Sequence, residues 1–146
     1  MAITYENVIF DRVIDSLHTI IADEFSIPVL YDQFAERGNQ SFLITPVSDE
    51  YEEEINIGQV RNYTVNVNYQ IDFAGNYTKN SLKQVAMVAE RIKRLIYNNR
   101  NYSVSGTRQF YNAVVENIEY VRDEDNPDLL GVDMVCLLYT SDAADE

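Results

Sequence analysis

Residues 62–73 read Asn-Tyr-Thr-Val-Asn-Val-Asn-Tyr-Gln-Ile-Asp-Phe and, from Tyr63 on, alternate without a break between apolar and polar side chains. Successive side chains of a β-strand point to opposite faces, so this pattern predicts a strand with one buried face and one polar face. The apolar face would carry Tyr63, Val65, Val67, Tyr69, Ile71 and Phe73. The other face is rich in amides and would meet water or a polar contact with another subunit. A long strand that covers a core on one side is therefore expected at the centre of the fold.

An amphipathic helix is predicted on each side of this strand. In residues 5–25, apolar side chains recur every three or four positions, and Pro28 follows shortly after the end of the pattern. In residues 81–98, a second stripe is formed by Leu82, Val85, Ala89, Ile92 and Ile96. Ser81 and Gln84 have the spacing of a capping box, which marks the start of a helix. Both helices would bury their apolar stripe against a sheet.

Shorter strands are predicted at residues 29–31, 41–45, 113–122 and 130–135, with polar loops at 35–40 and 100–109 and an acidic turn at 123–128. The run from Asp49 to Glu54 holds five carboxylates in six positions, and this self-repulsion predicts a solvated loop. The order of elements predicts an α+β fold, with a mostly antiparallel sheet of about four to five strands and two helices packed on one face.

The composition is that of one ordered globular domain of 146 residues, with 46% hydrophobic residues. The formal net charge of −13 disfavours a nucleic-acid grip over the whole surface, although it leaves room for a local basic patch. No apolar run approaches the roughly 18 residues that span a bilayer. The first eleven residues lack a basic segment followed by an apolar one, so a soluble protein without a secretory signal is expected.

The last eleven residues, Cys136 to Glu146, resemble one translated reading frame of the transposon-end adapter used in preparing sequencing libraries. This resemblance divides the chain into a single α+β domain at residues 1–135 and a non-native, adapter-derived tail at residues 136–146. The apolar residues from Cys136 to Tyr139 would be able to extend a final strand even if they are foreign. No function is assigned to the tail.

Residues for catalysis or metal binding are scarce. One cysteine, Cys136, and one histidine, His18, are too few for a disulfide or a typical structural zinc site. Asp123, Asp125 and Asp128 superficially suggest a calcium loop, but the sixth loop position, which needs a glycine for its sharp turn, is Asp128 itself. We therefore predict no catalytic residue, no cofactor and no metal, and expect a protein that is not an enzyme.

Two charged groups are the candidate interaction residues. Arg91, Lys93 and Arg94 crowd the last turns of the second helix and are followed by Arg100, although cations are also favoured at a helix C-terminus without any ligand. They would meet either phosphate or, more plausibly, an acidic neighbour such as another copy of this chain. The acidic candidates are Asp49, Glu50, Glu52, Glu53 and Glu54.

The layout resembles the tail terminator proteins of long-tailed bacteriophages, of the lambda minor tail protein U type, and their tail-completion relatives. The resemblance is carried by the helix at residues 5–25, the strand at 62–73, the helix at 81–98 and the hairpin at 113–135. In that family a small α+β subunit forms a hexameric ring that stops tail-tube polymerisation, without catalysis. The resemblance implies a homo-oligomer whose partners are the tail tube protein and the head–tail connector protein. It also implies a place in the tail or neck of the virion after assembly in the host cytoplasm, with DNA only passing through a lumen and no membrane contact.

A closed head-to-tail ring needs two different complementary surfaces on each subunit. The resemblance suggests that the basic group lies near an intersubunit or tube contact, and that the acidic run faces a partner or the lumen. Negative charge along a lumen would keep passing DNA from sticking. The alternatives are a head–tail adaptor or neck protein, a small metal-dependent hydrolase that uses Asp49, Glu52, Asp123 and Asp125, and a cellular binding module of similar fold.

Overall fold

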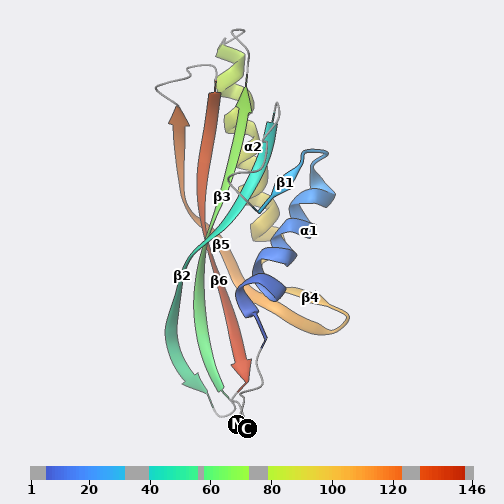
Figure 1. Cartoon of the computed structure of the whole chain (residues 1–146), viewed down its shortest axis with the longest axis vertical. Helices are drawn as coiled ribbons and strands as arrows, with labels where there is room; N and C mark the ends of the chain where they lie inside the picture. Colours follow the sequence, from blue (N-terminus) through green and yellow to red (C-terminus); the bar gives the residue numbers. More distant parts are fainter. Residues whose placement is uncertain (1–5, 32–39, 56–57, 73–78, 123–128, 144–146) are drawn as a thin grey trace.

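The computed structural model describes residues 6–31, 40–55, 58–72, 79–122 and 129–143. Figure 1 shows the order of the elements along the chain, which are η1 (Ile9–Ile14, a π-helical turn), α1 (Asp15–Glu24), β1 (Val29–Leu30), β2 (Gln40–Ile55), β3 (Gly58–Asp72), α2 (Lys79–Asn98), β4 (Tyr102–Val104), β5 (Thr107–Arg122) and β6 (Leu129–Ala143). The described strands form one sheet in the order β1-β2-β3-β6-β5-β4.

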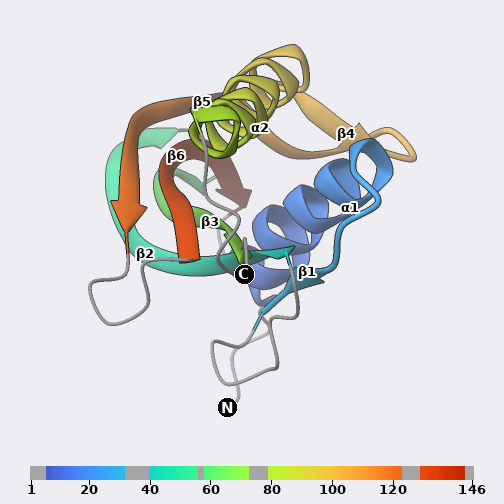
Figure 2. The same ribbon diagram turned by 90° about the horizontal axis from the view of Figure 1, so that it is seen from above.

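The predicted fold class is wrong in the number and the pairing of the strands. The sheet has six described strands rather than four to five, and it is mixed because β1 pairs parallel with β2. Parallel neighbours normally need a connection of a dozen or more residues, so the short segment between β1 and β2 argued for antiparallel pairing. The sheet is also strongly curled (Figure 2), because the twist accumulates along strands of 15 or 16 residues in β2, β3, β5 and β6.

The alternation in β3 produces the buried face that the sequence predicts. Tyr63, Val65, Val67 and Tyr69 are at most 4% exposed, while Phe73 lies outside the described residues. β3 pairs with β2 on one side and β6 on the other, both antiparallel. The same face of the sheet is completed by Phe42, Ile44, Val132, Met134, Cys136 and Leu138.

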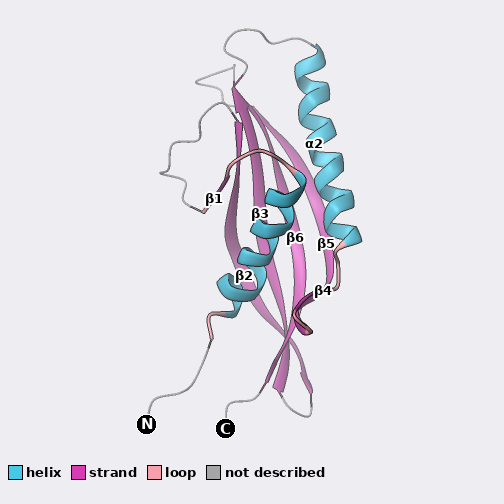
Figure 3. Ribbon diagram, turned by 90° about the vertical axis from the view of Figure 1, so that its right-hand side faces the viewer, coloured by secondary structure: helices cyan, strands magenta, loops and turns pink. Residues whose placement is uncertain are grey.

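Both helices pack on this buried face, on the concave side of the sheet (Figure 3). α2 buries Val85, Val88, Ala89, Ile92 and Ile96, and it begins at Lys79, two residues before the expected cap at Ser81. Leu82, expected on the inner stripe, is instead 48% exposed. None of the helices in the described ranges is long and apolar enough to cross a membrane.

Residues 136–143, the described part of the predicted foreign tail, lie in the middle of the sheet. Residues 136–143 form the second half of β6, where they pair with β3, and residues 136, 137 and 139 also pair with β5. Cys136, Leu138 and Thr140 are at most 1% exposed. Their alternating pattern fits a strand whatever their origin, so the adapter origin of this segment stays a prediction.

Candidate subunit interface

The acidic run is part of a strand, so the predicted solvated loop is wrong. β2 continues through Asp49 to Ile55, and it pairs with β3 up to Gly58. The residues from Glu50 to Glu54 are exposed, which lets water screen their mutual repulsion, and alternation along a strand keeps neighbouring carboxylates on opposite sides. Asp49 accepts a hydrogen bond from Arg61 Nε across the hairpin at 2.8 Å.

On the side away from β3, the second half of β2 has no pairing strand within the described ranges. β1 pairs only with Phe42 and Leu43. The edge carries Pro46, clustered carboxylates and two register shifts, which are features that protect edge strands from indiscriminate pairing. It also exposes two apolar side chains, Val47 at 60% and Tyr51 at 56%. We call residues 47–54 the acidic edge.

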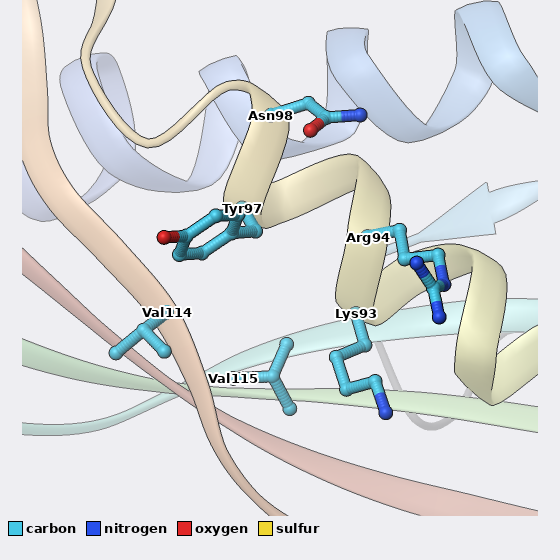
Figure 4. A pocket seen from close by; sticks show the side chains of 6 residues that line it. All are labelled: Lys93, Arg94, Tyr97, Asn98, Val114 and Val115. Atoms are coloured by element: carbon cyan, nitrogen blue, oxygen red, sulfur yellow. The ribbon is translucent and has the colours of Figure 1, made fainter.

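A pocket of about 440 Å³ lies between the end of α2 and β5. Figure 4 shows its lining residues, of which α2 contributes Lys93, Arg94, Tyr97 and Asn98, and β5 contributes Val114 and Val115. Tyr97 is 55% exposed and Val114 is 39% exposed, so apolar surface is open to solvent at the pocket. We call this site the α2–β5 pocket.

The α2–β5 pocket carries an excess of positive charge. Lys93 Nζ lies 2.6 Å from Glu90 Oε2, and Arg94 Nε lies 3.7 Å from the same oxygen, so two cations share one carboxylate. The close contact with Lys93 is the main reason that the pKa of Glu90 is lowered. The guanidinium of Arg100 stacks on the ring of Tyr97, 4.7 Å from its centroid. The neighbourhood is thus both basic and aromatic.

Arg91, the fourth basic candidate, has a different environment. Its guanidinium donates to Glu24 Oε1 at 2.8 Å and lies 4.2 Å from the ring centroid of Phe25. Glu24 ends α1 and Phe25 follows it directly, so Arg91 links the two helices. The structure therefore groups Lys93, Arg94 and Arg100 at one surface and places Arg91 in a contact within the subunit.

A bulge in β5 shapes the wall of the pocket opposite α2. Asn112 adopts φ of +52°, a left-handed conformation that asparagine tolerates better than most residues. Its backbone N–H donates to Asn101 Oδ1 at 3.2 Å, and the N–H of Ala113 donates to the carbonyl oxygen of Arg100 at 3.0 Å. These bonds tie β5 to the segment that leaves α2, next to Tyr97 and Val114.

The β4–β5 hairpin beside the pocket was missed, because residues 100–109 are polar enough to predict a loop. The available signal was Ser105-Gly106, which forms the turn with φ of 51° and 80°. A pair of residues with positive φ, the second a glycine, is typical of a two-residue hairpin turn.

Exposed apolar side chains continue along the same flank of the molecule. A second hollow of about 150 Å³ is lined by Leu82 and Val85 of α2, Tyr120, Val121 and Arg122 of β5, and Leu130 and Gly131 of β6. Of these, Leu82, Tyr120 and Val121 are 40% exposed or more. The flank formed by α2 and β5 therefore exposes apolar side chains at both hollows.

Within the described parts of the chain, no three histidine, cysteine, aspartate or glutamate side chains come together in a way that would hold a metal ion. Asp49 and Glu52 are both on β2. Asp123, Asp125 and Asp128 lie outside the described residues, as do the predicted acidic turn and the loop at 35–39.

The sequence was compared with known protein families and with curated proteins, and neither comparison found a match.

Proposed function

We propose that this protein is a structural subunit of a bacteriophage virion, a tail terminator that assembles head to tail into a hexameric ring. The ring would cap the tail tube and join it to the head connector. The observation that carries this proposal is that one chain exposes two unlike surfaces, the acidic edge of β2 and the basic, aromatic α2–β5 pocket. Each surface combines apolar side chains with charge of one predominant sign, as protein interfaces often do.

Unlike surfaces favour a closed ring over a two-fold dimer. A two-fold dimer could pair an acidic edge with a pocket only if both surfaces lay within one interface. They lie toward opposite borders of the sheet, so a two-fold contact centred on either surface would bring like charges together. Contact between the acidic edge of one subunit and the pocket of the next instead repeats from copy to copy, and it forms a ring where the rotation between neighbours closes. The choice of this class of ring among structural proteins rests on the resemblance of the sequence layout to tail terminators, which is a prediction.

The net charge of −13 is compatible with a ring through which DNA passes. DNA phosphates are repelled by an acidic lumen, and binding to it would release no counterions. The proposed partners are therefore proteins, namely the tail tube protein and the head–tail connector protein, rather than nucleic acid.

Electron microscopy of the purified protein, alone and mixed with tail tubes from the virus that encodes it, tests this proposal. We expect rings with a central opening, and we expect them at one end of each tube. A head–tail adaptor would instead bind to portal complexes and leave the tubes bare. A protein that forms no rings and binds to neither tubes nor portals would contradict a role in the virion.

A further inference from the structure

We infer that the acidic edge of one copy docks into the α2–β5 pocket of the next copy, with Tyr51 as the anchor. This inference rests on the proposed ring and names the surfaces that would join its subunits. The occupant of the pocket is therefore a second copy of this chain.

Tyr51 has the character of an interface anchor. Its side chain is 56% exposed on an edge strand, and tyrosine is enriched among the few residues that dominate binding energy. The pocket offers about 440 Å³ between Tyr97 and two valines, which is within the usual range for sites that receive a ligand-sized group. Aromatic rings such as Tyr51 and Tyr97 attract each other in stacked or edge-to-face arrangements.

The charges around these two groups are complementary. Glu50 and Glu52 flank Tyr51, both are exposed, and a register shift between Tyr51 and Glu53 interrupts the regular alternation there. These carboxylates, one on either side of Tyr51 in the sequence, make the electrostatic potential around this part of the edge negative. At the pocket, Lys93 and Arg94 share the single carboxylate of Glu90 and leave positive charge for a partner.

Docking through side chains is favoured over the addition of β2 as a further strand. Beyond Phe110, β5 has no described partner on the side away from β6, so its edge could in principle accept a strand. That part of β5 carries Glu116 and Glu119. If the acidic edge of β2 paired with it, carboxylates of the two strands would face each other, and like charges across paired strands are destabilising. The basic end of α2 is therefore the better site for an acidic partner.

Charge reversal tests this inference with two variants of the whole chain. Glu50→Lys/Glu52→Lys makes the edge basic while the pocket stays basic, and Lys93→Glu/Arg94→Glu makes the pocket acidic while the edge stays acidic. Each variant alone would place like charges in the contact, so we expect each to be monomeric by light scattering. An equimolar mixture has opposite charges at every edge-to-pocket contact, so we expect the mixture to regain the mass of the wild-type ring.

Three controls make the result specific. Lys83→Glu reverses an exposed charge at the other end of α2 and should leave the mass unchanged. Tyr51→Ala keeps all charges and should weaken association by about tenfold or more if Tyr51 is an anchor. Circular dichroism melting of each variant shows whether a loss of mass comes from unfolding. Only variants that stay folded test the docking surfaces.

The possible outcomes separate this inference from the proposed function. If the wild type forms rings and the two reversal variants also form them, the docking surfaces are wrong while the ring stands. If the wild type forms rings and both variants are folded monomers that stay monomeric when mixed, the docking surfaces are also wrong and the ring again stands. If the wild type is monomeric, the proposed ring is wrong and the docking inference is overturned with it.

Discussion

At the scale of single residues, Gly131 in β6 is closely confined by the neighbouring strand β3. A Cβ atom at this position would lie 2.9 Å from the backbone oxygen of Tyr69 on the neighbouring strand, which is too close for two atoms held by a sheet. We expect Gly131→Ala to lower the free energy of unfolding by about 1–3 kcal/mol, because strands in the middle of the sheet must shift. Denaturant titration measures this loss. Thr107→Ala, at an exposed position, should change stability by less than about 0.5 kcal/mol, and an equal loss in both variants would contradict the explanation.

The buried thiol of Cys136 makes stability depend on alkaline pH. Burial raises the pKa of Cys136 from 9.0 to about 12. In the unfolded chain the thiol ionises above pH 9, whereas the folded chain keeps its proton, so the stability is complete below pH 9 and falls as the pH rises toward 12. The loss should be on the order of 1 kcal/mol per pH unit.

Denaturant titrations at pH 8 and pH 10.5 measure this slope. Cys136→Ala should lower stability at both pH values, since it removes a buried group, but it should reduce the difference between them. Burial also raises the pKa of Tyr69, so a smaller loss in the same direction should remain. An unchanged pH dependence in Cys136→Ala would show that the thiol does not cause it.

At the scale of secondary-structure elements, Arg91 is expected to act within the subunit. The pair with Glu24 and the stacking on Phe25 are both partly exposed, so we expect Arg91→Ala to cost about 0.5–1 kcal/mol of stability. We expect no change in the mass of the assembly, in contrast to the reversal of Lys93 and Arg94 on the same helix. Thermal melting and light scattering of this variant separate the two roles. A folded but dissociated Arg91→Ala protein would place Arg91 at the interface.

The elements that the sequence predicted well are those with an uninterrupted pattern. β3 follows from its alternation, and α2 follows from a stripe that runs for about four turns from Leu82 to Ile96, although Leu82 itself is exposed. The second half of β2 was missed because its residues bury little, and its extended state depends on pairing with β3. β4 is too short for a pattern, and only its turn at Ser105-Gly106 marks it.

Only part of the candidate site was predictable, because some of its features are patterns in the sequence and others depend on tertiary contacts. A cluster of like charges is visible in a sequence, so Lys93, Arg94, Arg100 and the acidic run could all be named as candidates, and their role at an interface stays a prediction. The roles of the neighbouring apolar residues were not visible, because Tyr97 and Val114 meet only when the bulge at Asn112 brings β5 beside the end of α2. The different role of Arg91 likewise depends on α1, which is distant in the sequence.

At the scale of the whole molecule, the second half of β6 joins residues 58–65 of β3 to the first half of β5. Residues 136–143 pair with β3 over their whole length and with β5 at residues 136, 137 and 139, and they bury Cys136, Leu138 and Thr140. A chain that ends at Val135 would leave residues 58–65 of β3 without their partners on β6, and β5 without its partners at residues 136, 137 and 139. We expect this chain to lose its cooperative thermal transition, which circular dichroism would detect. A truncated chain that melts like the full one would show that residues 136–143 do not contribute to the core.

The curled sheet also explains why two unlike surfaces are available on so small a molecule. Its long strands leave β2 uncovered on one side and β5 uncovered on the other among the described residues, while both helices occupy the concave face. The acidic edge and the α2–β5 pocket lie on these two different borders of the sheet. Under the proposed function, these two borders would carry the contacts between neighbouring copies.

The mass of the wild-type protein in solution, measured by multi-angle light scattering at about 0.1 M and 1 M salt, tests the central claim most directly. We predict one species of six times 16.9 kDa at low salt, and a shift toward smaller species at 1 M salt, where the screening length falls to about 3 Å. A folded protein with a mass of 16.9 kDa under both conditions would contradict the claim that this chain is built to assemble through two unlike surfaces.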